Sequence, residues 1–362
     1  MANKKKVMLI TGSSGRIGKA LCKRFGEKYQ IVGFDRHKGV GENIDHVEMD
    51  VSSDESVKKG MDYVRNKYGS RIGPVIHLAA YYSFSQGELS LYEEITVQGT
   101  RRILDALQDF DEVEQFHFAS TLLVYKPCAL GVKINEGSPV DAKWDYPKSK
   151  VETEKVIKEH GGKIPTVVMR IAGCYDNECH SIPIGHNIQR IYEHELDSHL
   201  FPGDVRHGNP FLHLEDLVDA YELAIEKRKS LPQNLIVNIG EDLTIPYGKL
   251  QNMISEVLEH KDFEVFRVPK WVAKTGAFVE DEIPGFDTFI QPWMIDVADD
   301  NYELDISFAK EMLGWSPKRY LDRYLPVMME LLKTDPIKWY EINQFDMSER
   351  MKKHIQDQKT HA

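Results

Sequence analysis

The chain has 362 residues, 41% of them hydrophobic and 28% charged, which is typical of a globular protein rather than a disordered one. Its net charge of −11 disfavours nucleic acids and anionic membrane surfaces as partners, because both attract Lys and Arg. No apolar run is long enough for a membrane helix or a signal peptide, and four cysteines are too few for a disulfide framework, so we expect a cytoplasmic protein.

Short apolar runs alternate with helical patterns through the first 240 residues. In chain order, strands are expected at 6–11, 30–34, 46–49, 74–78, 114–118, 166–170 and 235–238. Helical stretches lie between these strands. The alternation predicts an α/β fold, with a Rossmann-type doubly wound parallel sheet that helices cover on both faces.

The length and the pattern together predict two lobes. Residues 1–175, completed by 211–240, are expected to form an NAD-binding Rossmann domain. Two segments, 176–210 and 241–330, break the alternation and carry many Pro, His and aromatic residues. We expect them to form a smaller substrate-binding lobe.

The last segment, residues 331–362, is expected to be a C-terminal helical tail. Asp335-Pro336 predicts the start of a helix, because Pro is favoured at the first helical position. Four apolar residues of the tail are expected to dock on the body, namely Ile337, Tyr340, Ile342 and Phe345.

The first expected turn carries three glycines spaced every third residue, Gly12, Gly15 and Gly18, between a strand and a helix. Backbone N–H groups at such a helix start can cradle a pyrophosphate, which larger side chains would hold away. Asp35 ends the next strand, where a carboxylate can accept hydrogen bonds from the adenosine ribose and repel a 2′-phosphate. NAD is therefore favoured over NADP. Two arginines could instead hold that phosphate, namely Arg16 and Arg36.

Tyr146 and Lys150 are four residues apart, which places them on one face of a helix. A free tyrosine titrates near about 10 and exchanges protons poorly at neutral pH. A nearby ammonium favours the phenolate and tunes the group for acid/base catalysis. An exposed Tyr and Lys without function would show the same spacing. The catalytic interpretation of the pair therefore depends on the other motifs of the chain.

Further motifs follow in order, namely His77-Leu78-Ala79-Ala80, the run from Phe118 to Tyr125, the stretch from Phe211 to Asp216, and the segment from Leu313 to Pro317. With the glycine turn and the Tyr146/Lys150 pair, they closely resemble the extended short-chain dehydrogenase/reductase family, in its NAD-dependent epimerase/dehydratase branch. The likeness covers nearly the whole chain. It implies an enzyme that uses NAD at a secondary alcohol or carbonyl.

The resemblance also implies roles for individual residues. Thr121 matches the hydroxyl that hydrogen-bonds the reacting oxygen, Tyr146 matches the acid/base, and Lys150 matches the residue that tunes Tyr146 and holds the nicotinamide ribose. Cofactor contacts are further implied for Gly12, Ser14, Gly15, Arg16, Ile17, Gly18, Asp35, Arg36, Asp50, Val51, Leu78, Ala79 and Ala80. No metal is implied. Family members commonly form homodimers, here through helices near 88–108 and 145–159.

The sequence departs from the family pattern at two places. Leu122 and Leu123 stand where dehydratases and decarboxylases carry acidic residues, so elimination is disfavoured. Asn209-Pro210 stands where relatives that act on nucleotide sugars often carry an Arg, and no Arg lies between Arg267 and Arg319. The usual diphosphate clamp is therefore weakened. Arg190, Arg206 or lysines could substitute for it.

Three functions remain open at this point. The first is an epimerase of a sugar or sugar-like substrate that keeps its cofactor bound. The second is a dehydrogenase or reductase, with a non-sugar carbonyl as one alternative, that exchanges cofactor each turnover. The third is a regulator that senses a dinucleotide without catalysis, which the intact Tyr146 and Lys150 disfavour.

Overall fold

The computed structural model describes residues 5–37, 44–83, 88–281 and 292–361. Residues 282–291, within the expected substrate lobe, lie outside the described residues. Among the helices of the described ranges, none is long and apolar enough to cross a membrane.

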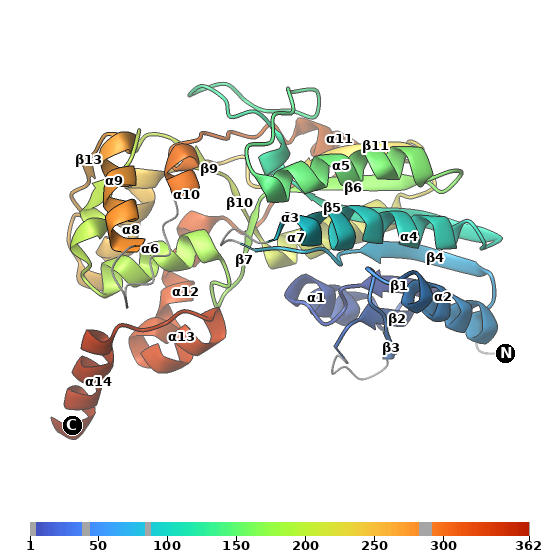
Figure 1. Cartoon of the computed structure of the whole chain (residues 1–362), viewed down its shortest axis with the longest axis horizontal. Coiled ribbons are helices and arrows are strands. Elements are labelled where there is room, and N and C mark those ends of the chain that lie inside the picture. Colours follow the sequence, from blue (N-terminus) through green and yellow to red (C-terminus); the bar gives the residue numbers. More distant parts are fainter. Residues whose placement is uncertain (1–4, 38–43, 84–87, 282–291, 362) are drawn as a thin grey trace.

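A parallel sheet of seven strands forms the body of the molecule, with the order β11-β6-β5-β4-β1-β2-β3 (Figure 1). All neighbouring strands pair in parallel, so their carboxyl ends meet at one edge. The order reverses between β1 and β4, which is where such sheets bind ligands. The strands are β1 (Val7–Thr11), β2 (Gln30–Asp35), β3 (Ile44–Glu48), β4 (Arg71–His77), β5 (Glu112–Thr121), β6 (Thr166–Ile171) and β11 (Asn234–Ile239).

Helices cover both faces of this sheet. One hydrophobic cluster joins it to α1 (Arg16–Phe25), α7 (Leu214–Glu226) and α11 (Ser307–Leu313). The other face packs against α2 (Asp54–Tyr68), α4 (Gln98–Leu107) and α5 (Asp145–His160). α4 continues from α3 (Leu89–Leu91) and the π-helical segment η1 (Tyr92–Val97). The predicted doubly wound sheet is confirmed.

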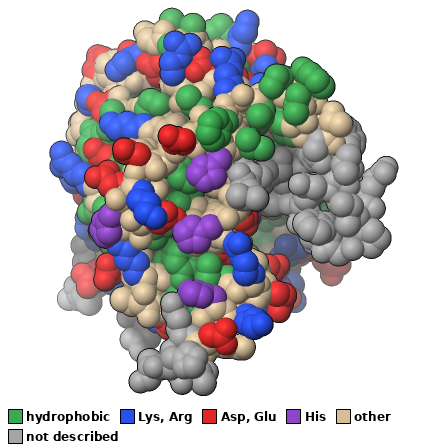
Figure 2. All heavy atoms as spheres, turned by 90° about the vertical axis from the view of Figure 1, so that its left-hand side faces the viewer, with side chains coloured by type: hydrophobic (Ala, Val, Ile, Leu, Met, Phe, Trp, Pro, Cys, Tyr) green, Lys and Arg blue, Asp and Glu red, His purple; other side chains and the backbone are tan. Residues whose placement is uncertain are grey.

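The second lobe has its own hydrophobic core and lies at the left of Figure 1. Its core is built from α6 (Ile182–Tyr192), α8 (Tyr247–Glu259), α12 (Leu321–Thr334), α13 (Pro336–Asn343) and α14 (Glu349–His361). Further helices of the described residues are η2 (Leu122–Val124), η3 (Leu196–His199), α9 (Lys270–Asp281) and α10 (Pro292–Val297). Figure 2 faces this end and shows acidic and basic side chains interspersed with hydrophobic ones.

Three two-stranded sheets complete the structure. They pair β7 (Gly173–Tyr175) with β10 (Phe211–His213), β8 (Leu200–Phe201) with β13 (Phe266–Arg267), and β9 (Gly208–Asn209) with β12 (Ile245–Pro246). β7 directly follows β6, and β10 directly precedes α7. The β7–β10 pair therefore connects the large sheet to the second lobe.

The tail docks on the second lobe, but not through all four expected residues. α13 begins at Pro336, where the Asp335 side chain caps the Lys338 N–H at 3.2 Å. Tyr340 is buried and Phe345 packs against the core of the lobe. Ile337 is 43% exposed, so its predicted docking is wrong. Trp339 is buried instead, because its ring faces the lobe and its indole N–H donates to Met328 O at 3.1 Å.

Candidate active site

The glycine turn holds strand β1 and helix α1 at close approach. Gly12 has a φ of +69°, a left-handed conformation that favours glycine. A Cβ on Gly18 would lie 2.2 Å from Gly12 O and 2.7 Å from Ser13 Cα, so only glycine fits there. A Cβ on Gly15 would meet only Gly12 O, at 3.3 Å. The turn therefore brings the N-terminus of α1 against the carboxyl edge of the sheet.

A cavity of about 530 Å³ opens at this edge. Twelve of the predicted cofactor residues line it, namely Gly12, Gly15, Arg16, Ile17, Gly18, Asp35, Arg36, Asp50, Val51, Leu78, Ala79 and Ala80. Ser14 does not line it, but its backbone N–H donates to Asp35 Oδ2 at 3.0 Å. The glycine cradle, the helix N-terminus and the acid at the end of β2 fit a dinucleotide.

Four other residues line the cavity without having been predicted: Phe34, Met49, Tyr82 and Ile95. Phe34 precedes Asp35, and Met49 precedes Asp50. Both could therefore have been predicted from their positions next to acids at strand ends. Ile95 lies in η1 and reaches the cavity only through the packing of that helix, which no local pattern indicates.

Two carboxylates among the predicted cofactor residues, Asp35 and Asp50, are held in place by hydrogen bonds. Asp35 Oδ1 accepts from His37 N at 3.2 Å, and Oδ2 accepts from Ser14 N. Asp50 accepts hydrogen bonds from the Ser52 hydroxyl at 2.7 Å and the Ser52 N–H at 2.9 Å. The Ser52 side chain is the main cause of a lowered Asp50 pKa, and Arg36 and Arg102 add to it.

A buried histidine of β4 hydrogen-bonds residues of β1 and α4. His77, at the end of β4, hydrogen-bonds the hydroxyl of Thr11 through Nδ1 at 2.7 Å and that of Thr100 through Nε2 at 2.9 Å. Thr11 in turn accepts from the N–H groups of Leu78 and Ala79 at 3.2 Å. Burial lowers the pKa of His77 to about 3, so the ring is neutral at physiological pH.

The three predicted catalytic residues meet at the carboxyl end of β5. Thr121 is the last residue of that strand, and Tyr146 and Lys150 lie on the first turns of α5. The Thr121 hydroxyl lies close enough to the Tyr146 phenol to lower its pKa as a hydrogen-bond partner. Lys150 Nζ donates to Ala119 O at 2.8 Å and lies 5.7 Å from the centre of the Tyr146 ring.

Two aromatic rings flank Tyr146. The Tyr82 ring meets it edge-on with ring centres 4.9 Å apart, and the Trp144 ring lies 5.5 Å away. Tyr82 also lines the cavity, whereas Thr121, Tyr146 and Lys150 are not among its lining residues. Among the described residues, Tyr146 therefore adjoins the cavity only through the Tyr82 ring. These contacts fix the direction of the phenol.

The protonation of the Tyr146–Lys150 pair differs from the expectation. Burial raises the pKa of Tyr146 to about 12, and the hydrogen bond with Thr121 only partly opposes it. Burial also lowers the pKa of Lys150 to about 7, against the charge of Glu154, which raises it. The expected stabilisation of the phenolate by Lys150 is therefore not seen in this geometry, since desolvation outweighs attraction for both groups.

A buried ion pair between Glu154 and Arg170 lies close to Lys150. Glu154, one helical turn further along α5, accepts two hydrogen bonds from Arg170, at 3.1 and 2.6 Å, and one from the Ser120 hydroxyl at 2.6 Å. The Arg170 guanidinium lies 4.7 Å from the centre of the Tyr125 ring. This arrangement fixes α5 against β5 and β6.

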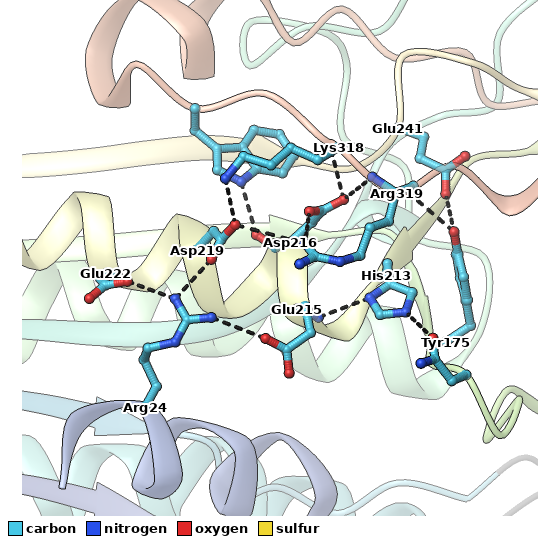
Figure 3. Close-up of polar contacts among 12 residues, drawn as sticks. Arg24, Tyr175, His213, Glu215, Asp216, Asp219, Glu222, Glu241, Lys318 and Arg319 are labelled. Atoms are coloured by element: carbon cyan, nitrogen blue, oxygen red, sulfur yellow. Dashed lines mark hydrogen bonds and ion pairs between the residues drawn. The ribbon is translucent and has the colours of Figure 1, made fainter. Parts of the chain in front are cut away.

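A polar network joins the second lobe to the sheet, as Figure 3 shows. Asp216, fully buried on α7, accepts from Arg319 Nη1 at 2.6 Å and from the backbone N–H groups of Lys318 and Arg319. Its own carbonyl accepts from the Trp315 indole N–H at 2.9 Å. Two of the predicted motifs thus bind each other and position the lobe, which no sequence spacing predicts.

The structure also shows the surroundings of the positions that depart from the family pattern. Leu122 is buried and Leu123 is half-buried beside Thr121, so no carboxylate stands there. Both arginines named as substitutes in a diphosphate clamp already contact carboxylates. Arg206 binds Asp204 through two nitrogens, at 2.6 to 3.1 Å, and Arg190 Nε lies 3.5 Å from Glu195.

The sequence and the structure both match known proteins. The family model "NAD dependent epimerase/dehydratase family" matches residues 8–240. A dTDP-6-deoxy-L-talose 4-dehydrogenase (NAD(P)(+)) of Kitasatospora kifunensis is 23% identical over 250 residues, 66% of this chain and 69% of the relative. An N-acetyl-alpha-D-glucosaminyl-diphospho-ditrans,octacis-undecaprenol 4-epimerase of Escherichia coli O157:H7 is 27% identical over 162 residues, 44% of this chain and 45% of the relative.

Among solved structures, the UDP-glucuronic acid 4-epimerase of Bacillus cereus, in complex with UDP-glucuronic acid and NAD, is similar with a TM-score of 0.69. The match covers 91% of this chain and 99% of that structure at 19% identity, and it shows the same fold. The chain therefore belongs to the NAD-dependent epimerase/dehydratase family and is an NAD-dependent enzyme of the extended short-chain dehydrogenase/reductase type.

Proposed function

We propose that the protein oxidises and reduces a secondary alcohol of a sugar or sugar-like substrate, with Tyr146 as the acid/base. The observation that carries this proposal is the meeting of Thr121, Tyr146 and Lys150 next to Tyr82, a residue that lines the cavity. When bound, NAD supplies the hydride acceptor and donor. The chain itself must then orient the alcohol and move one proton.

Tyr146 is suited to hold that proton. Its raised pKa keeps the phenol protonated at neutral pH, so it can donate to a carbonyl oxygen in the reductive direction. In the oxidative direction it must first lose its proton, and a cationic Lys150 would favour that loss. Thr121, hydrogen-bonded to Tyr146, is placed to orient the same oxygen.

The test is steady-state kinetics beside NAD titration for three variants. Tyr146→Phe keeps the ring between Tyr82 and Trp144, so NAD affinity should stay near wild type while turnover falls at least about a hundredfold. Lys150→Met should reduce both, and Thr121→Ala should give an intermediate loss of turnover. A Tyr146→Phe enzyme with more than about a tenth of wild-type turnover would contradict the acid/base role.

Retention of the cofactor separates the two catalytic alternatives. An epimerase returns the hydride to the same substrate and benefits from keeping NAD bound, whereas a dehydrogenase must exchange it. Relatives of both kinds are similar to this chain. Absorbance of purified protein after gel filtration should show bound NAD if the epimerase assignment holds, and its absence would favour the dehydrogenase.

The substrate is proposed to be sugar-like, and elimination chemistry is disfavoured because Leu122 and Leu123 provide no carboxylate. Relatives whose names include a dTDP-sugar or a diphospho-linked sugar support the sugar assignment. A panel of sugars, sugar acids and nucleotide sugars, followed by absorbance of reduced cofactor, identifies the class. Activity only with non-sugar carbonyls would contradict it.

We propose that residues 176–210 and 241–330 supply the substrate side of the site. α6 and α8 share the core of the second lobe, which supports this division. Within the range 241–330, α11 packs on the sheet rather than in the second lobe. α12 continues past residue 330 into the tail.

We also propose a cytoplasmic homodimer that pairs through the region 88–108 and through α5. η1 and α4 pack against α5 on one face of the sheet, and Leu91 and Val151 are partly exposed there. Within the region 88–108, Leu104 of α4 is fully buried in the fold and is therefore not available to a partner subunit. Sedimentation at micromolar concentration should give twice the mass of 41.7 kDa, and a monomer would contradict the proposal.

A further inference from the structure

Arg16 is the first residue of α1, between Gly15 and Gly18 of the glycine turn, and its side chain crosses to the other lobe. Its Nη1 lies 3.4 Å from Asp176 Oδ2, and its Nη2 donates to Cys174 O at 3.3 Å. Arg16 also lines the cavity. One side chain therefore touches both the expected cofactor site and the segment that leads into the second lobe.

The direction of this side chain decides which part of the cofactor it can meet. Asp35 ends β2, on one side of β1, whereas Cys174 belongs to β7, which follows β6 on the other side of β1. Arg16 points to the second side, away from the ribose acid. It is therefore placed for the pyrophosphate, which lies at the start of α1 in such sites, and not for a 2′-phosphate.

Asp176 is held in place by several groups. Its carboxylate accepts from His180 Nδ1 at 2.9 Å and from Glu178 N at 3.0 Å. The side chain is only 17% exposed. The carboxylate that faces Arg16 is thus part of a built turn rather than a mobile surface group.

The turn itself is in an uncommon conformation. Cys179 and His180 are consecutive non-glycine residues with φ of +84° and +42°, which costs free energy unless the surroundings fix it. Asp176 and Cys179 exchange two backbone hydrogen bonds of 3.1 Å. Asn343 of α13 accepts from His180 N at 2.7 Å and donates to Glu178 O at 3.0 Å. The tail therefore helps to lock this turn.

We propose that Arg16 and Asp176 form a clasp across the mouth of the NAD site, in which Asp176 positions Arg16 over the pyrophosphate and the pair slows release of the cofactor. The inference rests on the NAD site assigned to the cavity. A guanidinium binds phosphate oxygens through several donors in a fixed plane, and a carboxylate partner fixes that plane before the cofactor arrives.

The experiment measures the dissociation rate constant of NADH from full-length protein by fluorescence, after displacement with excess NAD. Arg16→Met should raise this rate constant about tenfold, because a charge-assisted hydrogen bond to the pyrophosphate is lost. Asp176→Asn should raise it by a smaller factor. In the double variant the effect should equal that of Arg16→Met alone, since Asp176 acts through Arg16.

A matched control lies on the same helix. Arg24 of α1 binds Asp219 of α7 at 2.8 Å, away from the cavity-lining residues. Asp219→Asn removes a similar ion pair between α1 and a neighbouring element, and should leave the NADH dissociation rate constant within a factor of about two. Arg16→Lys, which keeps the charge but not the planar fork, should lie between wild type and Arg16→Met.

Several outcomes would overturn the clasp. These are an Arg16→Met rate constant within about twofold of wild type, additive effects of the two single variants, or an Arg16→Met variant that loses NADPH more than NADH, which would place Arg16 at the 2′-phosphate. If Asp176→Asn fails to fold, the series from Arg16 to Lys to Met decides alone. Wild-type protein that binds no NADH would instead contradict the cofactor assignment itself.

Discussion

Lys150 combines a buried ammonium with a position beside the proposed acid/base. Its Nζ donates to Ala119 O and lies 4.7 Å from the centre of the Phe118 ring. Because burial lowers its pKa to about 7, whereas an unfolded lysine titrates near about 10.4, the unfolded state binds more protons between these pH values. Lys150 therefore penalises folding fully below pH 7, and the penalty decreases as pH rises.

We expect Lys150→Met to gain stability relative to wild type at pH 6.5 and to lose most of that advantage by pH 9.5. Urea unfolding of cofactor-free protein at several pH values measures it. Lys148→Met, in the exposed lysine two residues earlier, is the control and should show no such trend. A difference between wild type and Lys150→Met that is the same at both pH values would contradict the buried ammonium.

Asp35 is the residue expected to set the choice of cofactor. Its carboxylate lines the cavity and Arg16 points to the other side, so of the two arginines considered for a 2′-phosphate, Arg36 is the one on the side of Asp35. Asp35→Ala should raise the affinity for NADPH relative to NADH about tenfold, because a like charge near the 2′-phosphate is removed. Fluorescence titration measures both affinities. An unchanged ratio would assign the discrimination elsewhere.

The β1–turn–α1 unit was predicted almost completely from its residues, because its constraint is local. The spacing of the three glycines reflects close approaches that the structure contains, such as the one between Gly18 and Gly12 O. The two-residue strands of the second lobe were not predicted, since their pairing depends on contacts between distant segments, as in Leu200 with Phe266. Local patterns carry no signal for such pairs.

Two glycines of this unit should separate stability from binding. Gly18→Ala would place a methyl group 2.2 Å from a backbone oxygen, so the turn must shift, and we expect a loss of about 1–3 kcal/mol in unfolding free energy together with weaker NAD binding. Gly15→Ala meets only one atom at 3.3 Å but lines the cavity, so it should weaken NAD binding with little loss of stability. Denaturation and NAD titration test both, and equal stability losses would contradict the packing argument.

Across the whole molecule, the sequence indicated which residues matter but not how the lobes are joined. The glycine turn, Asp35, Thr121, Tyr146 and Lys150 come together at one edge of the sheet, as parallel strands require. The joint itself depends on long-range pairs, such as Arg319 with Asp216 and Arg16 with Asp176. These pairs join residues more than 100 positions apart, and although Arg16 and Asp216 lie within recognised motifs, nothing in either motif identifies the partner residue.

The central sheet also carries an acid-sensitive element. His77 and His117 are fully buried, and burial lowers the pKa of each to about 3, with the charge of Lys150 adding to the effect at His77. An unfolded histidine titrates near about 6.5, so the unfolded state binds more protons between pH 6.5 and 3. The contribution of these residues to stability is therefore present above pH 6.5 and is lost as pH falls through this window.

His117→Phe should make the protein less sensitive to acid. The ring lies 5.8 Å from that of Tyr221 and has one polar contact, with Gln115 Oε1 at 2.8 Å, so an aromatic replacement keeps most of the packing. Between pH 6 and 4, the slope of unfolding free energy against pH should decrease by up to one proton, about 1.4 kcal/mol per pH unit. His260→Asn, at an exposed left-handed helix end that Asn tolerates, is the control and should keep the wild-type slope. An unchanged slope in His117→Phe would show that His117 binds as many protons in the folded state as in the unfolded state. Its protonation would then make no contribution to unfolding by acid.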